Sequence, residues 1–153
     1  MKQVFLFTTL TTLLAGNALA VEFNTDALKS MQEEGHKIVE ESQAGRPYKS
    51  AGGLCLDIAG NGLVVRNCNA NAKTQKWSVD GQNRMVAHDG RCLSGPQLSQ
   101  CGNSKAQKWK HDNKQRLANQ NNMCLQVQAN PPQAGTKVGV AGCKDQVAAQ
   151  VWK

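Results

Sequence analysis

Gln75-Lys76-Trp77 is the first of three places in this sequence where a Gln stands two residues before a Trp. The others are Gln107-Lys108-Trp109 and Gln150-Val151-Trp152, and together the three contain every Trp of the chain. Each follows the second member of a cysteine pair by six or seven residues. The chain is therefore a threefold internal repeat, and such a repeat governs the whole fold.

The six cysteines follow the same repeat. The first Cys of each pair stands among alternating apolar residues, a pattern typical of a strand with one buried face. These stretches are residues 54–58, 91–94 and 123–127. Counting alone leaves many pairings open, but the phase of the repeats selects one disulfide in each repeat. The predicted pairs are Cys55 with Cys68, Cys92 with Cys101, and Cys124 with Cys143.

Residues 1–20 have the composition of a cleaved secretory signal peptide. A basic start at Lys2 precedes an apolar, Thr-rich run, and Ala18-Leu19-Ala20 ends in the small-x-small pattern of a cleavage site. The run is too short to span a bilayer, which takes roughly 20 residues, and no later segment qualifies. We expect a secreted or periplasmic product without a transmembrane segment, in an oxidising compartment where the cysteines form disulfides.

Residues 21–47 differ in character from the rest of the chain. Asn24 can cap a helix, Leu28, Met31 and Ile38 have the spacing of one narrow apolar stripe, and a Gly-Arg-Pro sequence ends the pattern. The sequence predicts a short acidic helix and linker here, followed by short strands between Gly, Asn and Asp turns. The β-rich domain is expected over residues 48–153, with repeats at about 50–82, 83–115 and 116–153.

Charge divides at the same boundary. Residues 21–45 have six acidic residues against two lysines, a net charge of −4, whereas residues 46–153 have 15 Lys and Arg against five Asp, or +10. The simplest interpretation is that the acidic helix packs on its own basic domain. The alternative is that the basic face attracts an anionic partner, such as an acidic glycan, through contacts that salt weakens. We do not expect nucleic acid as the partner.

The three Q-x-W signatures, each after a Cys-Leu strand and a second Cys, resemble the ricin-type β-trefoil lectin family over about residues 50–153. The resemblance implies an all-β fold in which three repeats form a six-stranded barrel capped by three hairpins. In that family the Gln and Trp are structural and do not contact the ligand. Core positions are therefore implied for Gln75, Trp77, Gln107, Trp109, Gln150 and Trp152.

The resemblance also implies where a sugar would bind. Binding repeats of this family have a carboxylate just after Cys-Leu, an aromatic ring on the hairpin and an amide near the Q-x-W signature. Asp57 is the only such carboxylate, because Ser94 and Gln126 take its place in the other repeats, and Arg66 stands where the ring is expected. The first repeat is the best candidate, for a different or charged ligand. The candidate residues are Asp57, Arg66, Asn67 and Asn69.

Each candidate residue also has a structural interpretation. Asp57 is equally suited to cap the turn at residues 60–62, Arg66 to be an exposed strand residue, and the two Asn residues to form turns. The sequence predicts that Asp57 is a surface carboxylate. Its removal is then expected to change the unfolding free energy by no more than about 1 kcal/mol. Both interpretations stay open at this point.

Catalysis is not expected of this chain. Every Cys is assigned to a disulfide, no His lies in a catalytic motif, and the Asp residues form no evident pair for glycoside hydrolysis. Without C-x-x-C or spaced histidines, we expect neither a metal nor a cofactor. Two binding functions remain. One is an exported carbohydrate- or glycoconjugate-binding module; the other is a protein-interaction or cell-targeting subunit of a toxin-like complex, with degenerate sugar pockets and a partner at the helix.

Overall fold

The computed structural model describes residues 24–43 and 45–153, so the predicted signal peptide lies outside the described residues. The predicted helix is present as α1, Thr25–Gln43. Asn24 starts it, because its side-chain oxygen accepts the N–H of Ala27 at 3.2 Å and its carbonyl accepts the N–H of Leu28 at 3.2 Å. Within the described ranges, no helix has both the length and the apolar character needed to cross a membrane.

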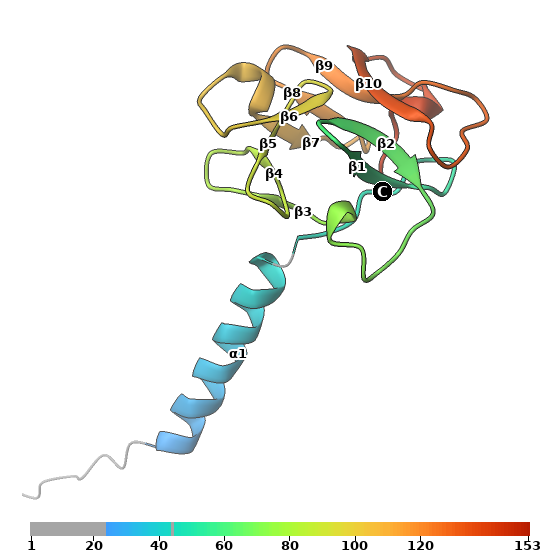
Figure 1. Ribbon diagram of the computed structural model, residues 1–153. Helices are drawn as coiled ribbons and strands as arrows, with labels where there is room; N and C mark the ends of the chain where they lie inside the picture. Colours follow the sequence, from blue (N-terminus) through green and yellow to red (C-terminus); the bar gives the residue numbers. More distant parts are fainter. Residues whose placement is uncertain (1–23, 44) are drawn as a thin grey trace, which may run out of the picture.

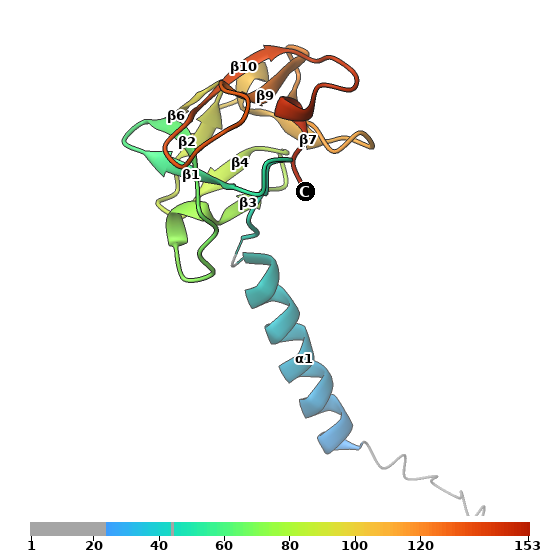
Figure 2. The same ribbon diagram turned by 90° about the vertical axis from the view of Figure 1, so that its right-hand side faces the viewer.

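α1 projects away from the β domain as a single rod (Figures 1 and 2). Residues 24–35 are all exposed, including Leu28 at 52% and Met31 at 72%. The expectation that the acidic helix packs on its own basic domain is therefore wrong for this part of the helix. Opposite net charge is the main attraction between this part of the helix and the domain, and surface charges exposed to solvent and salt attract each other only weakly.

In the described residues the β domain has ten strands and three one-turn 3-10 helices. The strands are β1 Cys55–Ala59, β2 Gly62–Arg66, β3 Trp77–Val79, β4 Met85–Ala87, β5 Cys92–Ser94, β6 Gln97–Ser99, β7 Trp109–His111, β8 Leu117–Asn119, β9 Met123–Val127 and β10 Lys137–Gly142. The 3-10 helices are η1 Lys73–Gln75 before β3, η2 Lys105–Gln107 before β7 and η3 Ala148–Gln150 after β10. The order is β3-β4-β5-β6-β2-β10-β9-β8-β7, with β1 on β2 and every pair antiparallel.

One backbone hydrogen bond, made by the Trp of the Q-x-W signature, recurs in all three repeats. The N–H of each Trp donates to one carbonyl of a preceding segment, at 2.7–3.0 Å. The acceptors are Arg46 for Trp77, Asn83 for Trp109 and Gln115 for Trp152. Asn83 and Gln115 take positive φ angles of 61° and 59° to present these carbonyls. The contact recurs three times, as the repeats require, and the fold is the predicted all-β trefoil.

The tryptophans of the three signatures form the centre of the core, and none is more than 3% exposed. Each indole N–H donates to the carbonyl of the Leu that follows the first Cys of its own repeat, at 2.8–3.4 Å. A buried Trp therefore leaves no donor unsatisfied. Each repeat also contains one disulfide, and all six cysteines are paired as the repeat phase predicts. The bridges restrain the unfolded chain of a domain that has few aromatic residues.

Candidate functional site

The Q-x-W glutamines hold the three hairpins in one common geometry. Each side-chain oxygen accepts the N–H of the residue after the second Cys, at 2.7–2.9 Å. Each side-chain N–H donates to the carbonyl of the residue before that Cys, at 2.9–3.0 Å. Gln75, Gln107 and Gln150 are buried, so these bonds satisfy amides that would be costly to leave unpaired. The glutamines therefore fix the backbone framework of each hairpin.

The remaining hydrogen of each amide meets a different group in each repeat. In the first repeat it donates to the carboxylate of Asp57 at 3.0 Å. In the second it donates to the hydroxyl of Ser99 at 2.9 Å, and in the third to the side-chain oxygen of Gln126 at 3.0 Å. Only the first repeat places a charged acceptor at this point.

Asp57 lies in β1 and is only 3% exposed. Its Oδ1 accepts the N–H of Ile58 at 2.7 Å, and its Oδ2 lies 3.5 Å from Nη1 of Arg66. Burial acts to raise the pKa of Asp57, but hydrogen bonds from Gln75, Thr74 and Ile58, together with the charge of Arg66, outweigh it and hold the pKa below its usual value. The carboxylate is therefore ionised and fixed in direction at neutral pH.

Two expectations about Asp57 are corrected by this geometry. None of its hydrogen-bond partners lies in the turn at residues 60–62, so the turn-cap interpretation is wrong. It is also not a surface residue, because η1 and Arg66 cover the outer face of β1 at this position. Removing it must therefore affect stability more than a surface change would.

The four candidate residues of the first repeat line one open hollow of about 450 Å³, here called the Asp57 hollow. The residues are Asp57, Arg66, Asn67 and Asn69. The side chain of Arg66 is 49% exposed and reaches across β1, where its Nη1 donates to the carbonyl of Ile58 at 3.4 Å. Asn69 Oδ1 accepts the N–H of Asn71 at 2.9 Å, which fixes the loop after the disulfide. Residues as far apart in the sequence as Asp57 and Asn69 thus share one opening.

One wall of the Asp57 hollow was not predicted from the sequence. Ala134 and Gly135, in the loop between β9 and β10, line it from the third repeat. The loop reaches β2 because the N–H of Gly135 donates to the carbonyl of Val65 at 2.7 Å. The available signal was the spacing of 19 residues between Cys124 and Cys143, the longest of the three, which lengthens this hairpin.

The acidic residues of the β domain give no sign of a general acid. All five Asp have pKa values held below the usual range, because hydrogen bonds and ion pairs with neighbouring residues outweigh burial where it acts. A general acid would need a raised pKa. Over the part of the chain that the structure describes, no three His, Cys, Asp or Glu side chains are grouped as metal ligands.

Residues 43–152 match the ricin-type beta-trefoil lectin domain. No curated protein sequence matches the chain. Among solved structures, the earthworm R-type lectin C-half in complex with GalNAc has a TM-score of 0.60 at 16% identity, covering 70% of this chain and 94% of that one. The Vibrio vulnificus hemolysin/cytolysin β-trefoil lectin with bound N-acetyl-D-lactosamine has a TM-score of 0.55 at 23% identity, covering 70% and 90%.

A longer neighbour shares the fold over part of its length. It is a non-toxic homologue of type II RIPs from Momordica charantia (bitter gourd), in complex with alpha-methyl-D-galactoside, with a TM-score of 0.61 at 15% identity. The match covers 70% of this chain but only 46% of that one. At these identities, the solved structures show that the fold is shared.

Proposed function

Because this chain belongs to the ricin-type β-trefoil lectin family, we propose that it is an exported, non-catalytic carbohydrate-binding module whose ligand occupies the Asp57 hollow. The observation that carries the proposal is the convergence of Asp57, Arg66, Asn67 and Asn69 around one opening. The bound sugars of the earthworm and Vibrio vulnificus trefoils support carbohydrate as the ligand class. Export is supported by the leader predicted at residues 1–20 and by the three disulfides, which fit an oxidising compartment.

Asp57 is arranged to accept a hydrogen bond from a sugar hydroxyl. Ile58 holds one carboxylate oxygen, Gln75 holds the other and Thr74 adds a third hydrogen bond, so of the roughly four lone-pair sites of a carboxylate about one remains for a ligand. Because the carboxylate is already ionised and oriented, a sugar need not order it on binding. Hydrogen bonds to a charged acceptor are also stronger than those between neutral groups.

Arg66 gives the hollow a different chemistry from the ring of a binding repeat. A guanidinium is planar, can lie against a sugar face, and donates several hydrogen bonds in a fixed geometry. Ser99 and Ala141 occupy the matching positions of the other repeats, and neither offers a ring or a charge. The first repeat therefore fits a hydroxyl-rich sugar with acceptor groups that Arg66 can reach.

A glycan array followed by calorimetry tests the site. Asp57→Ala should lose at least about tenfold in affinity for any glycan that the unaltered protein binds, since it removes a charge-assisted hydrogen bond. The matched control is Gln126→Ala, which changes the same position of the third repeat. Equal affinities for Asp57→Ala and the unaltered protein would exclude the Asp57 hollow, and no binding of any glycan by the unaltered protein would exclude the function.

A protein-interaction or cell-targeting subunit of a secreted complex is the second candidate function, and α1 favours it. Leu28 and Met31 are exposed on a projecting helix, and helices in proteins gain most of their stability from packing of the apolar face, not from intrinsic propensity. A partner that covers the stripe would stabilise the helix. Cross-linking in the culture fluid should capture a protein that is lost from a Leu28→Ser, Met31→Ser variant. If the unaltered protein and the variant captured the same proteins, the apolar stripe of α1 would be excluded as the binding surface.

A further inference from the structure

The cations of the β domain fall into two groups. Every Asp of residues 46–153 is ion-paired with an Arg, and Lys114 joins the pair at Asp145. Apart from Lys114, the lysines whose surroundings the structure describes make no ion pair. The surplus positive charge of this domain is therefore held mainly by lysines, which are available to an external anion.

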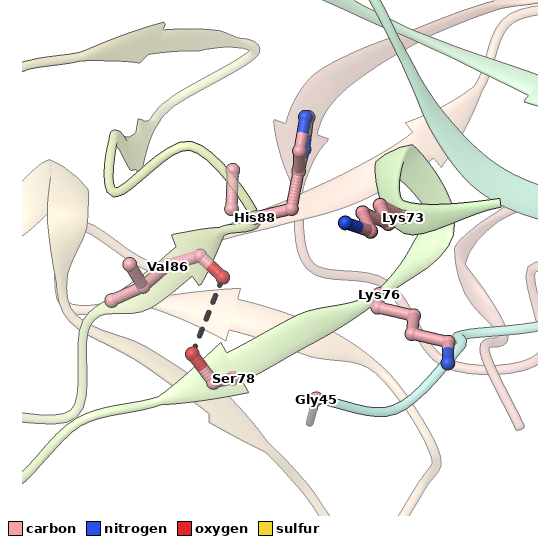
Figure 3. Close-up of a pocket in the computed structure, with 7 residues that line it drawn as sticks. Gly45, Lys73, Lys76, Ser78, Val86 and His88 are labelled. Carbon is pink, nitrogen blue, oxygen red and sulfur yellow. Dashed lines mark hydrogen bonds between the residues drawn. The ribbon is translucent and has the colours of Figure 1, made fainter. Parts of the chain in front are cut away.

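Two of these lysines, Lys73 and Lys76, line a second hollow of about 320 Å³, here called the Lys73 pocket (Figure 3). Ser78 of β3 and His88, directly after β4, complete its polar lining, and Gly45 of the linker lies at its edge. In Figure 3 the Lys73 side chain reaches into the space between η1 and the end of β4. No Asp or Glu lines the pocket. The Lys76 side chain extends from the rim toward the linker (Figure 3). A concave surface with one ammonium group inside, a second lysine at its rim and no carboxylate in its lining favours an anion.

The equivalent positions of the other repeats differ in chemistry and shape. Lys105 and Lys108 replace the two lysines in the second repeat, but there the N–H of Gln120 donates to both of their carbonyls, at 3.2 and 3.1 Å, and joins the two segments. In the third repeat Ala148 and Val151 replace them. The hollow beside Ala148 is lined mainly by Pro, Val and Ala, with Ser, Gly and Asn but no Lys or Arg. Of the three equivalent positions, the one at η1 therefore has both an open hollow and lysines in its lining.

We propose that the Lys73 pocket is a subsite for a carboxylate or sulfate group of the glycan held in the Asp57 hollow. η1 lies between the two openings, because Ala72 and Gln75 line the Asp57 hollow while Lys73 and Lys76 line the Lys73 pocket. A ligand longer than one sugar can therefore contact both sites. This inference rests on the proposed function, and it names the ligand class as acidic glycans.

The two subsites have opposite charge and therefore favour different groups of the ligand. Asp57 is ionised, so it favours neutral hydroxyl groups and repels an anion placed directly against it. The Lys73 pocket has the opposite character, and its ammonium groups can each donate a charge-assisted hydrogen bond to an acidic substituent. The preferred ligand therefore presents hydroxyls at one end and a negative charge at the other.

The test compares neutral glycans with sulfated and sialylated forms of the same backbone, N-acetyl-D-lactosamine among them. The unaltered protein should bind the acidic member of a pair about tenfold more tightly or better, the range of one charge-assisted contact. Lys73→Ala with Lys76→Val copies the third repeat and should bring both members to equal affinity. The control, Lys105→Ala with Lys108→Val, makes the same change of charge in the second repeat and should keep the preference.

Four outcomes would overturn the inference. Equal loss of preference in the two double variants would mean that acidic glycans respond only to the overall charge. Absence of preference in the unaltered protein would remove the subsite while leaving the proposed function intact, whereas failure to bind either member would remove both. Inorganic sulfate should lower affinity for the acidic member and leave that for the neutral member unchanged; equal competition against both would place the anion elsewhere.

Discussion

The first and third repeats hold their Q-x-W glutamines in the same way, yet the amides meet different side chains. Gln75 and Gln150 each make backbone bonds of 2.9 and 3.0 Å to the residues around the second Cys. Both then donate at 3.0 Å, one to the carboxylate of Asp57 and the other to the neutral amide of Gln126. The framework is thus threefold, while the chemistry of each site depends on positions that the framework does not constrain.

The framework should fail similarly when any of its tryptophans is removed. Trp109→Ala should cost about 3–5 kcal/mol of unfolding free energy, because a buried indole leaves a large cavity in the core. Trp152→Ala should cost a similar amount, since both side chains are no more than 3% exposed. Secretion yield and guanidinium unfolding measure the effect. A well-folded variant that loses less than about 1 kcal/mol would show that these tryptophans are not the shared core of the three repeats.

The two matching acceptors should differ in their contribution to stability. Asp57→Ala should destabilise the protein by about 1–3 kcal/mol, because it leaves the N–H groups of Gln75 and Ile58 without their buried acceptor. Gln126→Ala should cost less than about 1 kcal/mol, since Gln126 is only partly buried and neutral. Denaturant titration of the two variants measures both losses of unfolding free energy. Equal losses would mean that the charge at Asp57 does not distinguish the repeats.

The pH dependence of stability sharpens this comparison. The pKa of Asp57 is lower in the folded protein, so its stabilisation is complete above the unfolded pKa of about 3.9 and is lost as pH falls through the folded pKa. The difference in unfolding free energy between the unaltered protein and Asp57→Ala should therefore be constant from neutral pH to about 5 and shrink below about 4. Thermal unfolding measured over this range checks the sign, and a difference that grows in acid would contradict it.

The repeated elements could be predicted from the sequence because each signal occurs three times in phase. Spacing indicated the threefold repeat and the disulfides, and the family resemblance of the three Q-x-W signatures implied the trefoil. The burial of Asp57 could not be predicted in this way. Alternation in β1 indicates which face Asp57 takes, but the residues that cover that face, Arg66 and Gln75, come from elsewhere in the chain.

Contacts between repeats were the other part that the sequence did not reveal. Ala134 and Gly135 complete the Asp57 hollow from the third repeat, and a loop of small residues has no periodicity that would point to β2. Packing of α1 on the β domain was also wrongly predicted for residues 24–35, because charge complementarity between two regions does not show whether they touch. Both errors concern long-range packing, whereas the local signals were sufficient for the strands and bridges.

The smallest effect is expected outside the threefold framework, at α1, which has no counterpart in the second or third repeat. Leu28→Ser with Met31→Ser should change the unfolding free energy of the β domain by no more than about 0.5 kcal/mol, because both side chains are exposed and the domain gains nothing from them. Val79→Ser is the matched control, an exposed apolar residue within the framework at 50%. Denaturant unfolding followed by Trp fluorescence reports on the β domain alone, since all three tryptophans lie there. A clear loss of stability in the α1 variant, with none in the control, would show that the helix packs on the domain in solution and that the framework extends beyond its three repeats.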